Sequence, residues 1–200
     1  RCKSTLSELF SLKPFVLLSQ HKTIVRQILR ALVVIHRSGY IHRDIKNDNI
    51  LIDYYGNIKI ADFGFATTIE AAVKGATQVP GTRYFMPPET FVAPRVYNET
   101  FDIWSVGILT FKLLVQTSHC LIHSRTKNGT ERKMKRLLEA GQVDMTRYIN
   151  DLGAVQRDFI QTALTVDFTK RPKASKCLKH KLFTNMKNKR NSNRIRRSPF

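Results

Sequence analysis

The chain has 200 residues, 42% of them hydrophobic, which is enough for one globular domain with its own core. No apolar run approaches the ~20 residues that a membrane-spanning helix needs, and the composition is not that of a disordered chain. The three cysteines lie far apart in the sequence, so they imply no disulfide framework, and they favour a reducing, intracellular setting.

The chain is strongly basic, with 34 Lys and Arg against 15 Asp and Glu and a formal net charge of +19. Such an excess favours acidic partners, whether nucleic acid, a membrane surface or phosphorylated protein. Part of the charge lies at the end, because eight Lys or Arg, and no Asp or Glu, occur between Lys179 and Phe200. We predict that residues 185–200 form a disordered basic tail, with a nuclear-import or nucleic-acid patch as the alternative interpretation.

Two helices and a hairpin are predicted in the first part of the chain. A cap at Ser4 and Thr5 precedes a short helix that closes before Pro14. Apolar residues at helical spacing predict a second helix over 23–37, ended by Ser38 and Gly39. Two β-branched runs, 50–52 and 58–60, flank a Tyr-Gly-Asn turn and predict a β-hairpin. Residues 61–96 show little periodicity, and so long an irregular stretch inside a compact domain is usually functional.

The remaining elements are helical. From Asp102 to Val115 the sequence is apolar on nearly every side, which predicts a helix buried in the middle of the domain. Residues 127–136 form a polar, basic stretch that runs into an apolar one, and amphipathic helices are predicted over 155–164 and 174–183. The predicted fold is therefore mainly α, with a small β-hairpin in front of a long loop.

The segment with most chemistry lies between the second helix and the hairpin. Asp44, Lys46 and Asn49 are close enough in sequence to converge on one small volume. A carboxylate can orient or deprotonate a hydroxyl, an ammonium offsets phosphate charge, and an amide oxygen can bind Mg²⁺. Asp62 follows the hairpin beside Phe63 and Gly64, and a second carboxylate there suits a hard cation that bridges phosphate oxygens.

These residues resemble the motifs of the eukaryotic protein kinases. Residues 42–49 read HRDIKNDN and residues 62–64 read DFG, as in that family. The resemblance continues in order through the end of an activation segment (81–89), the start of the central helix (102–107) and a late Lys-Arg-Pro (170–172). The sequence is most similar to the sterile-20-like, PAK-type serine/threonine kinases in residues 45–51, 61–66 and 157–160.

The resemblance implies a role for each matching position. Asp44 would be the catalytic base and Lys46 would steady the transferring phosphoryl group. Asn49 and Asp62 would bind Mg²⁺, and Leu51 would lie under the adenine of ATP, supported from below by two leucines of the central helix, Leu109 and Leu113. His42 would stack on Phe63. The regulatory positions implied in and around the activation segment are Arg43, Thr77, Thr82, Glu89 and Arg171, with Arg43 pairing to a phosphate, Thr77 as the best phosphosite, and Arg171 pairing to Glu89.

The resemblance also implies what the chain lacks. The Gly-rich loop, the strand Lys that contacts ATP and the helix Glu that pairs with it are absent from this sequence. We therefore expect residues 1–184 to be the C-terminal lobe of a kinase domain whose N-terminal lobe is missing from the chain, and we expect the chain alone to be inactive. The implied cofactors are ATP and Mg²⁺, the implied partners are protein substrates and upstream activators, and the expected location is cytoplasmic, or nuclear through the basic tail.

Two other functions stay open at this point. A pseudokinase would keep the fold and bind partners without catalysis, although intact Asp44, Lys46, Asn49 and Asp62 argue against it. A nucleic-acid binder driven by the tail lacks an aromatic-interleaved patch or a known motif. Asp102 is expected to cap its own helix and to hold the loop 42–49 through backbone bonds. The sequence does not indicate an oligomeric state.

Overall fold

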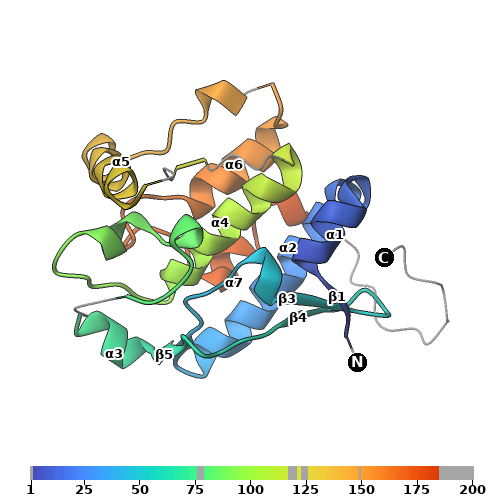
Figure 1. The fold of residues 1–200 in the computed structure, drawn as a ribbon, viewed down its shortest axis with the longest axis horizontal. Coiled ribbons are helices and arrows are strands. Elements are labelled where there is room, and N and C mark those ends of the chain that lie inside the picture. Colours follow the sequence, from blue (N-terminus) through green and yellow to red (C-terminus); the bar gives the residue numbers. More distant parts are fainter. Residues whose placement is uncertain (1, 76–78, 117–120, 123–125, 149, 185–200) are drawn as a thin grey trace.

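The computed structural model of the chain describes residues 2–75, 79–116, 121–122, 126–148 and 150–184. Helices make up most of it and the sheets are small, which confirms the mainly α prediction (Figure 1). The predicted tail, 185–200, lies outside the described residues. In chain order the elements are β1 (Cys2–Thr5), α1 (Leu6–Leu12), α2 (Pro14–Arg37), β2 (Tyr40–Ile41), η1 (Asn47–Asn49), β3 (Ile50–Asp53), β4 (Ile58–Ile60), β5 (Thr67–Thr68), α3 (Ile69–Val73), η2 (Arg83–Phe85), η3 (Pro88–Phe91), α4 (Thr100–Val115), α5 (Lys127–Ala140), η4 (Thr146–Tyr148), α6 (Ala154–Ala163), α7 (Ala174–Cys177) and η5 (Lys181–Phe183), where η marks a 3₁₀ turn.

The first two helices begin at local signals. The Thr5 hydroxyl accepts the Glu8 N–H at 3.0 Å and the Glu8 carboxylate accepts the Thr5 N–H at 2.9 Å, so both groups at the start of α1 are satisfied. The second helix begins at Pro14 rather than within the predicted range, because Pro is well suited to a first helical position and Leu17 continues the buried stripe. It ends at Arg37, as predicted.

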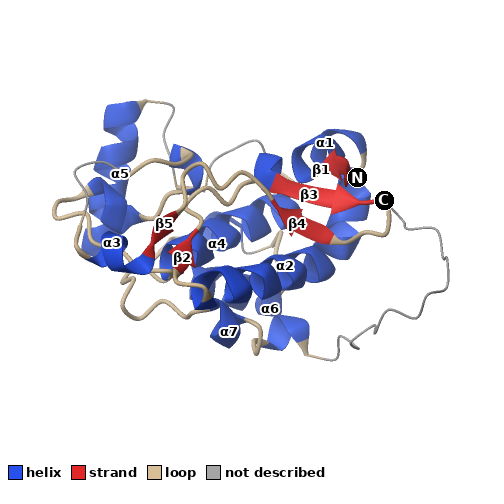
Figure 2. Cartoon of the chain, turned by 90° about the horizontal axis from the view of Figure 1, so that it is seen from below, coloured by secondary structure: helices blue, strands red, loops and turns tan. Residues whose placement is uncertain are grey.

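The hairpin of β3 and β4 forms as predicted, with Ile50 opposite Ile60. Its turn is closed by Asp53, whose Oδ1 accepts two backbone N–H groups of the turn at 2.9 Å each. The structure adds a third antiparallel strand, β1, beside β3 (Figure 2). This strand was not predicted, because its four residues show no apolar alternation.

Helix α4 lies at the centre of the molecule, as its sequence predicts. All residues from 100 to 111 are buried, and the helix packs against α2 on one side and α6 on another (Figure 1). The last predicted helix is wrong in extent: α7 ends at Cys177, and a separate turn, η5, follows. The backbone is extended at His180, whose Nδ1 accepts the Leu182 N–H at 3.1 Å and starts the new turn.

The long stretch after the hairpin is not regular, as expected, but it contains short elements. Strand β5 pairs with β2, helix α3 follows it, and two 3₁₀ turns, η2 and η3, lead to α4 (Figure 2). Within the part of the chain that the structure describes, no helix combines the length and apolarity that crossing a bilayer requires. The hairpin, the loop 42–49 and this stretch together surround the predicted site.

Candidate active site

The loop of residues 42–49 is attached to the central helix by one buried carboxylate. Asp102 of α4 accepts the backbone N–H groups of His42 and Arg43 at 2.9 Å each, and His36 of α2 contacts the same carboxylate through Nε2 at 2.8 Å. The prediction that Asp102 holds this loop is confirmed. The prediction that it caps its own helix is wrong, because it lies within the first turn of α4 and its oxygens serve the loop.

Three side chains, those of Lys46, Asn49 and Thr82, converge on the Asp44 carboxylate, which is only 1% exposed. Its Oδ2 lies 2.7 Å from Lys46 Nζ and accepts a hydrogen bond from Asn49 Nδ2 at 2.9 Å. Its Oδ1 accepts both the backbone N–H and the hydroxyl of Thr82, at 3.0 and 2.7 Å. Lys46 Nζ also donates to the Thr82 hydroxyl at 2.9 Å. The predicted convergence of Asp44, Lys46 and Asn49 is present, and Thr82, predicted only as part of the activation segment, contacts it directly.

These contacts keep Asp44 ionised. Burial alone would raise the pKa of its carboxyl group. The hydrogen bonds from Lys46 and Thr82, together with the Lys46 charge, outweigh burial and leave the pKa below its ordinary value. The site therefore holds a buried anion at neutral pH.

Asp62 is fixed beside this cluster by its two neighbours. The Ala61 N–H donates to the Asn49 carbonyl at 2.9 Å, and the Ala61 carbonyl lies 3.0 Å from His42 Nε2. Phe63 meets the His42 ring edge to face at 4.8 Å between centroids, so the expected stacking is present. Asp62 itself has a φ of 60°, which is unusual outside glycine, and an exposed carboxylate. The backbone on both sides of Asp62 is thus attached to the loop that carries Asp44.

The donor set at Asn49 and Asp62 fits a hard cation. Asn49 donates hydrogen bonds from its Nδ2 to the Asp44 backbone carbonyl and to the Asp44 carboxylate. Its Oδ1 makes no hydrogen bond within the described residues. Asp62 Oδ1 accepts the Gly64 N–H at 3.2 Å, while its other oxygen faces no partner in that same part of the chain. Among the described residues no cluster of three or more His, Cys, Asp or Glu could hold a metal ion. A cation here would complete its coordination with phosphate and water oxygens, as Mg²⁺ does.

Leu51 occupies the opposite face of β3 from its neighbours. Ile50 and Ile52 belong to the buried core together with Leu109 and Leu113 of α4, whereas Leu51 is half-buried and outside that core. Leu51 is not among the residues packed against this core, so the support expected from Leu109 and Leu113 is indirect. Side chains alternate along a strand, so α4 supports Leu51 through the residues on either side of it.

The end of the activation segment reaches Asp44 through a glycine. Gly81 has a φ of 136°, and a Cβ there would lie 2.7 Å from the Arg43 carbonyl oxygen, so only Gly allows this close approach. The Arg43 side chain donates to the Tyr97 hydroxyl at 2.8 Å and to the Phe65 carbonyl. Tyr97 is a contact that the sequence analysis missed, and no sequence signal marked it. The predicted phosphosite Thr77 lies outside the described residues.

The segment ends in a buried ion pair. Arg171 donates from both terminal nitrogens to the two carboxylate oxygens of Glu89, each at 2.9 Å, and both residues are at most 5% exposed. Its Nε donates to the Thr165 carbonyl at 2.8 Å, and the guanidinium lies 5.0 Å from the Trp104 ring centroid. The expected pairing of Glu89 and Arg171 is present, and it ties the activation segment to the helical core.

Comparisons with known proteins agree with this geometry. Residues 2–183 match the protein kinase domain family. The chain is 36% identical over 163 residues to serine/threonine-protein kinase MST20 of Pyricularia oryzae, a match that covers 80% of this chain and 17% of that protein. It is 33% identical over 161 residues to serine/threonine-protein kinase PAK 1 of Mus musculus, covering 80% of this chain and 28% of that protein.

The fold is similar to a chain in the crystal structure of the yeast RNA Pol II CTD kinase CTDK-1 complex, with a TM-score of 0.76, 23% identity, and coverage of 90% of this chain and 67% of that one. The curated relatives include sterile-20 and PAK-type kinases, which confirms the resemblance read from the motifs. The chain spans less than a third of the length of those relatives. On the match over residues 2–183, the chain belongs to the protein kinase family.

Proposed function

We propose that this chain carries the phosphoryl-transfer residues of a serine/threonine protein kinase, which moves the γ-phosphate of ATP to Ser and Thr hydroxyls of proteins. The observation that carries the proposal is the buried Asp44 carboxylate, held by Lys46, Asn49 and Thr82, with Asp62 fixed on the adjoining segment. Phosphoryl transfer needs mainly positioning and charge stabilisation, and this cluster supplies both.

Asp44 and Lys46 have different roles at the hydroxyl that accepts the phosphoryl group. The ionised Asp44 orients the substrate hydroxyl and takes its proton as the hydroxyl oxygen bonds to the γ-phosphorus and the bond from that phosphorus to the ADP oxygen breaks. Lys46 lies against Asp44, but its side chain is 21% exposed, so its charge reaches the transferring phosphoryl oxygens. Asn49 and Asp62 would hold Mg²⁺ through their oxygens, and the bound ion would offset the negative charge of the phosphates.

We further propose that the chain alone does not transfer phosphate. The sequence contains no Gly-rich loop, strand Lys or partner Glu with which kinases hold the nucleotide from its other side. Leu51 lies on the face of the hairpin turned away from the core, where it would meet an adenine ring held by a second lobe. Positioning ATP from one side only leaves the transfer without the orientation that accelerates it.

The test compares two forms of the protein with labelled ATP, Mg²⁺ and Ser- or Thr-containing protein substrates. The form extended by the residues encoded upstream of Arg1 should transfer label, and Asp44→Asn should lower that rate by roughly 10²-fold or more. The 200-residue chain should transfer none. Transfer by the short chain that Asp44→Asn removes would contradict the two-lobe proposal. A folded extended form that transfers no label would favour a scaffold.

Regulation by phosphorylation is a further part of this proposal. Arg43 is half-buried and donates to the Phe65 carbonyl and the Tyr97 hydroxyl, and its guanidinium is suited to pair with a nearby phosphate. Thr77 follows α3 in the same segment and is the proposed phosphosite. Mass spectrometry of the active protein should find phosphate on Thr77, and a fully active protein without phosphate in residues 61–96 would refute this assignment.

A further inference from the structure

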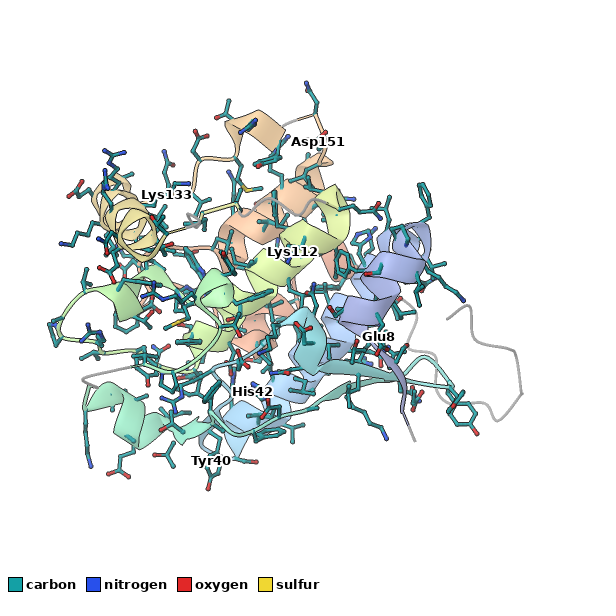
Figure 3. The ribbon with its side chains drawn as sticks, viewed as in Figure 1. Glu8, Tyr40, His42, Lys112, Lys133 and Asp151 are labelled. Atoms are coloured by element: carbon teal, nitrogen blue, oxygen red, sulfur yellow. The ribbon has the colours of Figure 1, made fainter. Side chains whose placement is uncertain are left out.

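Helix α5 presents a basic face next to the activation segment. Its inner face is apolar: Met134 is fully buried, and the helix packs against η3. Its outer residues, Arg132, Lys135 and Arg136, are exposed, and together with Lys133 they give the helix a run of cations at one edge of the molecule (Figure 3). Like charges this close together on one helix repel each other and destabilise the helix unless another interaction compensates for the repulsion.

Few carboxylates offset this charge. Within the residues that the structure describes, Arg132, Lys135 and Arg136 have no ion-pair partner. The helix carries two acids, Glu131 and Glu139. Glu131 is already engaged, at 3.5 Å from Arg83 of η2, in a contact that is about two fifths exposed on both sides. An anion approaching α5 would therefore meet positive charge that is not neutralised.

The same charge continues toward the proposed catalytic residues. Arg83 directly follows Thr82, whose hydroxyl bonds to Asp44. Lys112 of α4 places its Nζ 5.5 Å from the ring centroid of Phe85, and no carboxylate among the described residues pairs with it. Figure 3 labels Lys112 on α4 and Lys133 on α5, and the end of the activation segment runs between the two helices.

An exposed acid lies at the other end of the site. Asp48 belongs to η1, which packs against α1 and β1. In both ribbon views α1 and β1 lie at one side of the molecule and α5 lies at the other (Figures 1 and 2). A peptide lying across the site from the α1 side to the α5 side would therefore meet Asp48 at one end and the basic residues of α5 at the other.

We infer that the basic surface formed by Arg83, Lys112, Arg132, Lys135 and Arg136 binds an Asp- and Glu-rich segment of the protein substrate, on the α5 side of the acceptor residue. The inference rests on the proposed function only in naming the partner a substrate. Exposed charge pairs are individually weak, and at physiological salt they act over about 8 Å. Preference must therefore come from several cations that meet one acidic segment together, which this surface provides.

The experiment measures binding, without ATP, of a fluorescent Ser-centred peptide rich in Glu to the full 200-residue chain. A matched peptide carries Gln in place of Glu. The test variant combines Arg132→Glu, Lys135→Glu and Arg136→Glu. The control combines Lys176→Glu, Lys179→Glu and Lys181→Glu, which changes the net charge equally at exposed positions in α7, in η5 and between them. A second variant with Gln at the three α5 positions serves if the Glu variant does not fold, as judged by circular dichroism.

The wild-type chain should prefer the Glu peptide, and the α5 variant should weaken its binding roughly tenfold, while the control changes it by less than about twofold. Equal losses in the test and control variants would overturn the inference, because only net charge would then matter. Equal binding of the two peptides would also overturn it. Displacement of the peptide by single-stranded RNA that binds much more tightly and depends on the same α5 residues would assign the surface to nucleic acid instead.

This readout is independent of phosphoryl transfer. Peptide binding is measured without ATP, so it does not depend on the transfer step. If the peptide binds as expected but the extended protein transfers no phosphate, the proposed function fails and the acidic-segment site stands. If transfer occurs but the Glu and Gln peptides are phosphorylated equally, the inference fails and the proposed function stands.

Discussion

Asp102 shows how much of the site depends on one buried side chain. It accepts two backbone N–H groups of the loop 42–49, for which the described part of the chain offers no other acceptor, and it also contacts His36. A buried N–H left without an acceptor costs about 1–3 kcal/mol, more than a typical hydrogen bond contributes. The geometry of Asp44 two residues later therefore rests on a residue of another element.

We predict that Asp102→Asn lowers the free energy of unfolding by about 2–4 kcal/mol, because the amide nitrogen would face a backbone N–H at one of the two positions. Urea denaturation measures the change. Asp158→Asn is the matched control, since Asp158 is exposed and its ion pair among the described residues is with His180, and it should cost less than about 1 kcal/mol. Equal effects of the two substitutions would show that Asp102 is not the anchor of the loop.

At the residue scale, sequence reasoning succeeded where the residues are neighbours. Asp44, Lys46 and Asn49 lie within six positions of one another, so a short loop was enough to predict their convergence. The Thr82 hydroxyl and Tyr97 reach the same loop from far along the chain, and no local pattern specifies such contacts. The pairing of Glu89 with Arg171, equally distant, came from the resemblance to kinases and not from the physics of the sequence.

At the scale of elements, α2 carries a titratable group in its buried stripe. His21 is 8% exposed, and its Nδ1 lies 2.7 Å from the Leu18 carbonyl, which can only accept, so Nδ1 bears the proton. Its Nε2 is buried and has no hydrogen-bond partner among the residues that the structure describes, which suits the neutral ring. Burial lowers the pKa of His21 below 6.5, and the nearby Lys22 lowers it further, against the raising effect of the Leu18 bond.

The stability of α2 should therefore fall in mild acid. Below the ordinary pKa of about 6.5 the unfolded chain takes up a proton that folded His21 resists, so the free energy of unfolding decreases as the pH falls. We predict that the wild type loses more stability than His21→Phe between about pH 7.5 and about pH 5.5. Denaturant titrations at each pH measure this difference. Parallel pH profiles would mean that His21 titrates equally in both states.

Elements with a clear period were predicted well and the others were not. The apolar faces of α2 and α4 and the β-branched hairpin have strong periodicity, and their positions hold to within a few residues, apart from the start of α2. Strand β1 and helix α7 are defined by partners rather than by pattern: β1 by pairing with β3, and the end of α7 by the turn at His180. Tertiary contacts, not propensity, set those boundaries.

At the scale of the whole molecule, the apolar sequence of α4 predicted that this helix lies at the centre. Helices α2 and α6 pack against it, as that prediction requires. The placement of α5 beside the activation segment could not be predicted, because the polar face of a helix does not specify what it lies next to. Because of that placement, the basic residues of α5 form a surface on one side of the proposed site. The net charge of +19 alone favoured acidic partners without choosing one.

The central claim is that Asp62 and Asp44 share one site but have different tasks, one toward a cation and one toward a hydroxyl. Binding of Mn²⁺ and ATP, followed by electron paramagnetic resonance in the extended form of the protein, tests it most directly. The account predicts that Asp62→Asn weakens Mn²⁺ binding by roughly tenfold or more, whereas the chemically identical change Asp44→Asn shifts it by less than about threefold. Unchanged Mn²⁺ binding in Asp62→Asn, or equal weakening in both variants, would contradict the account.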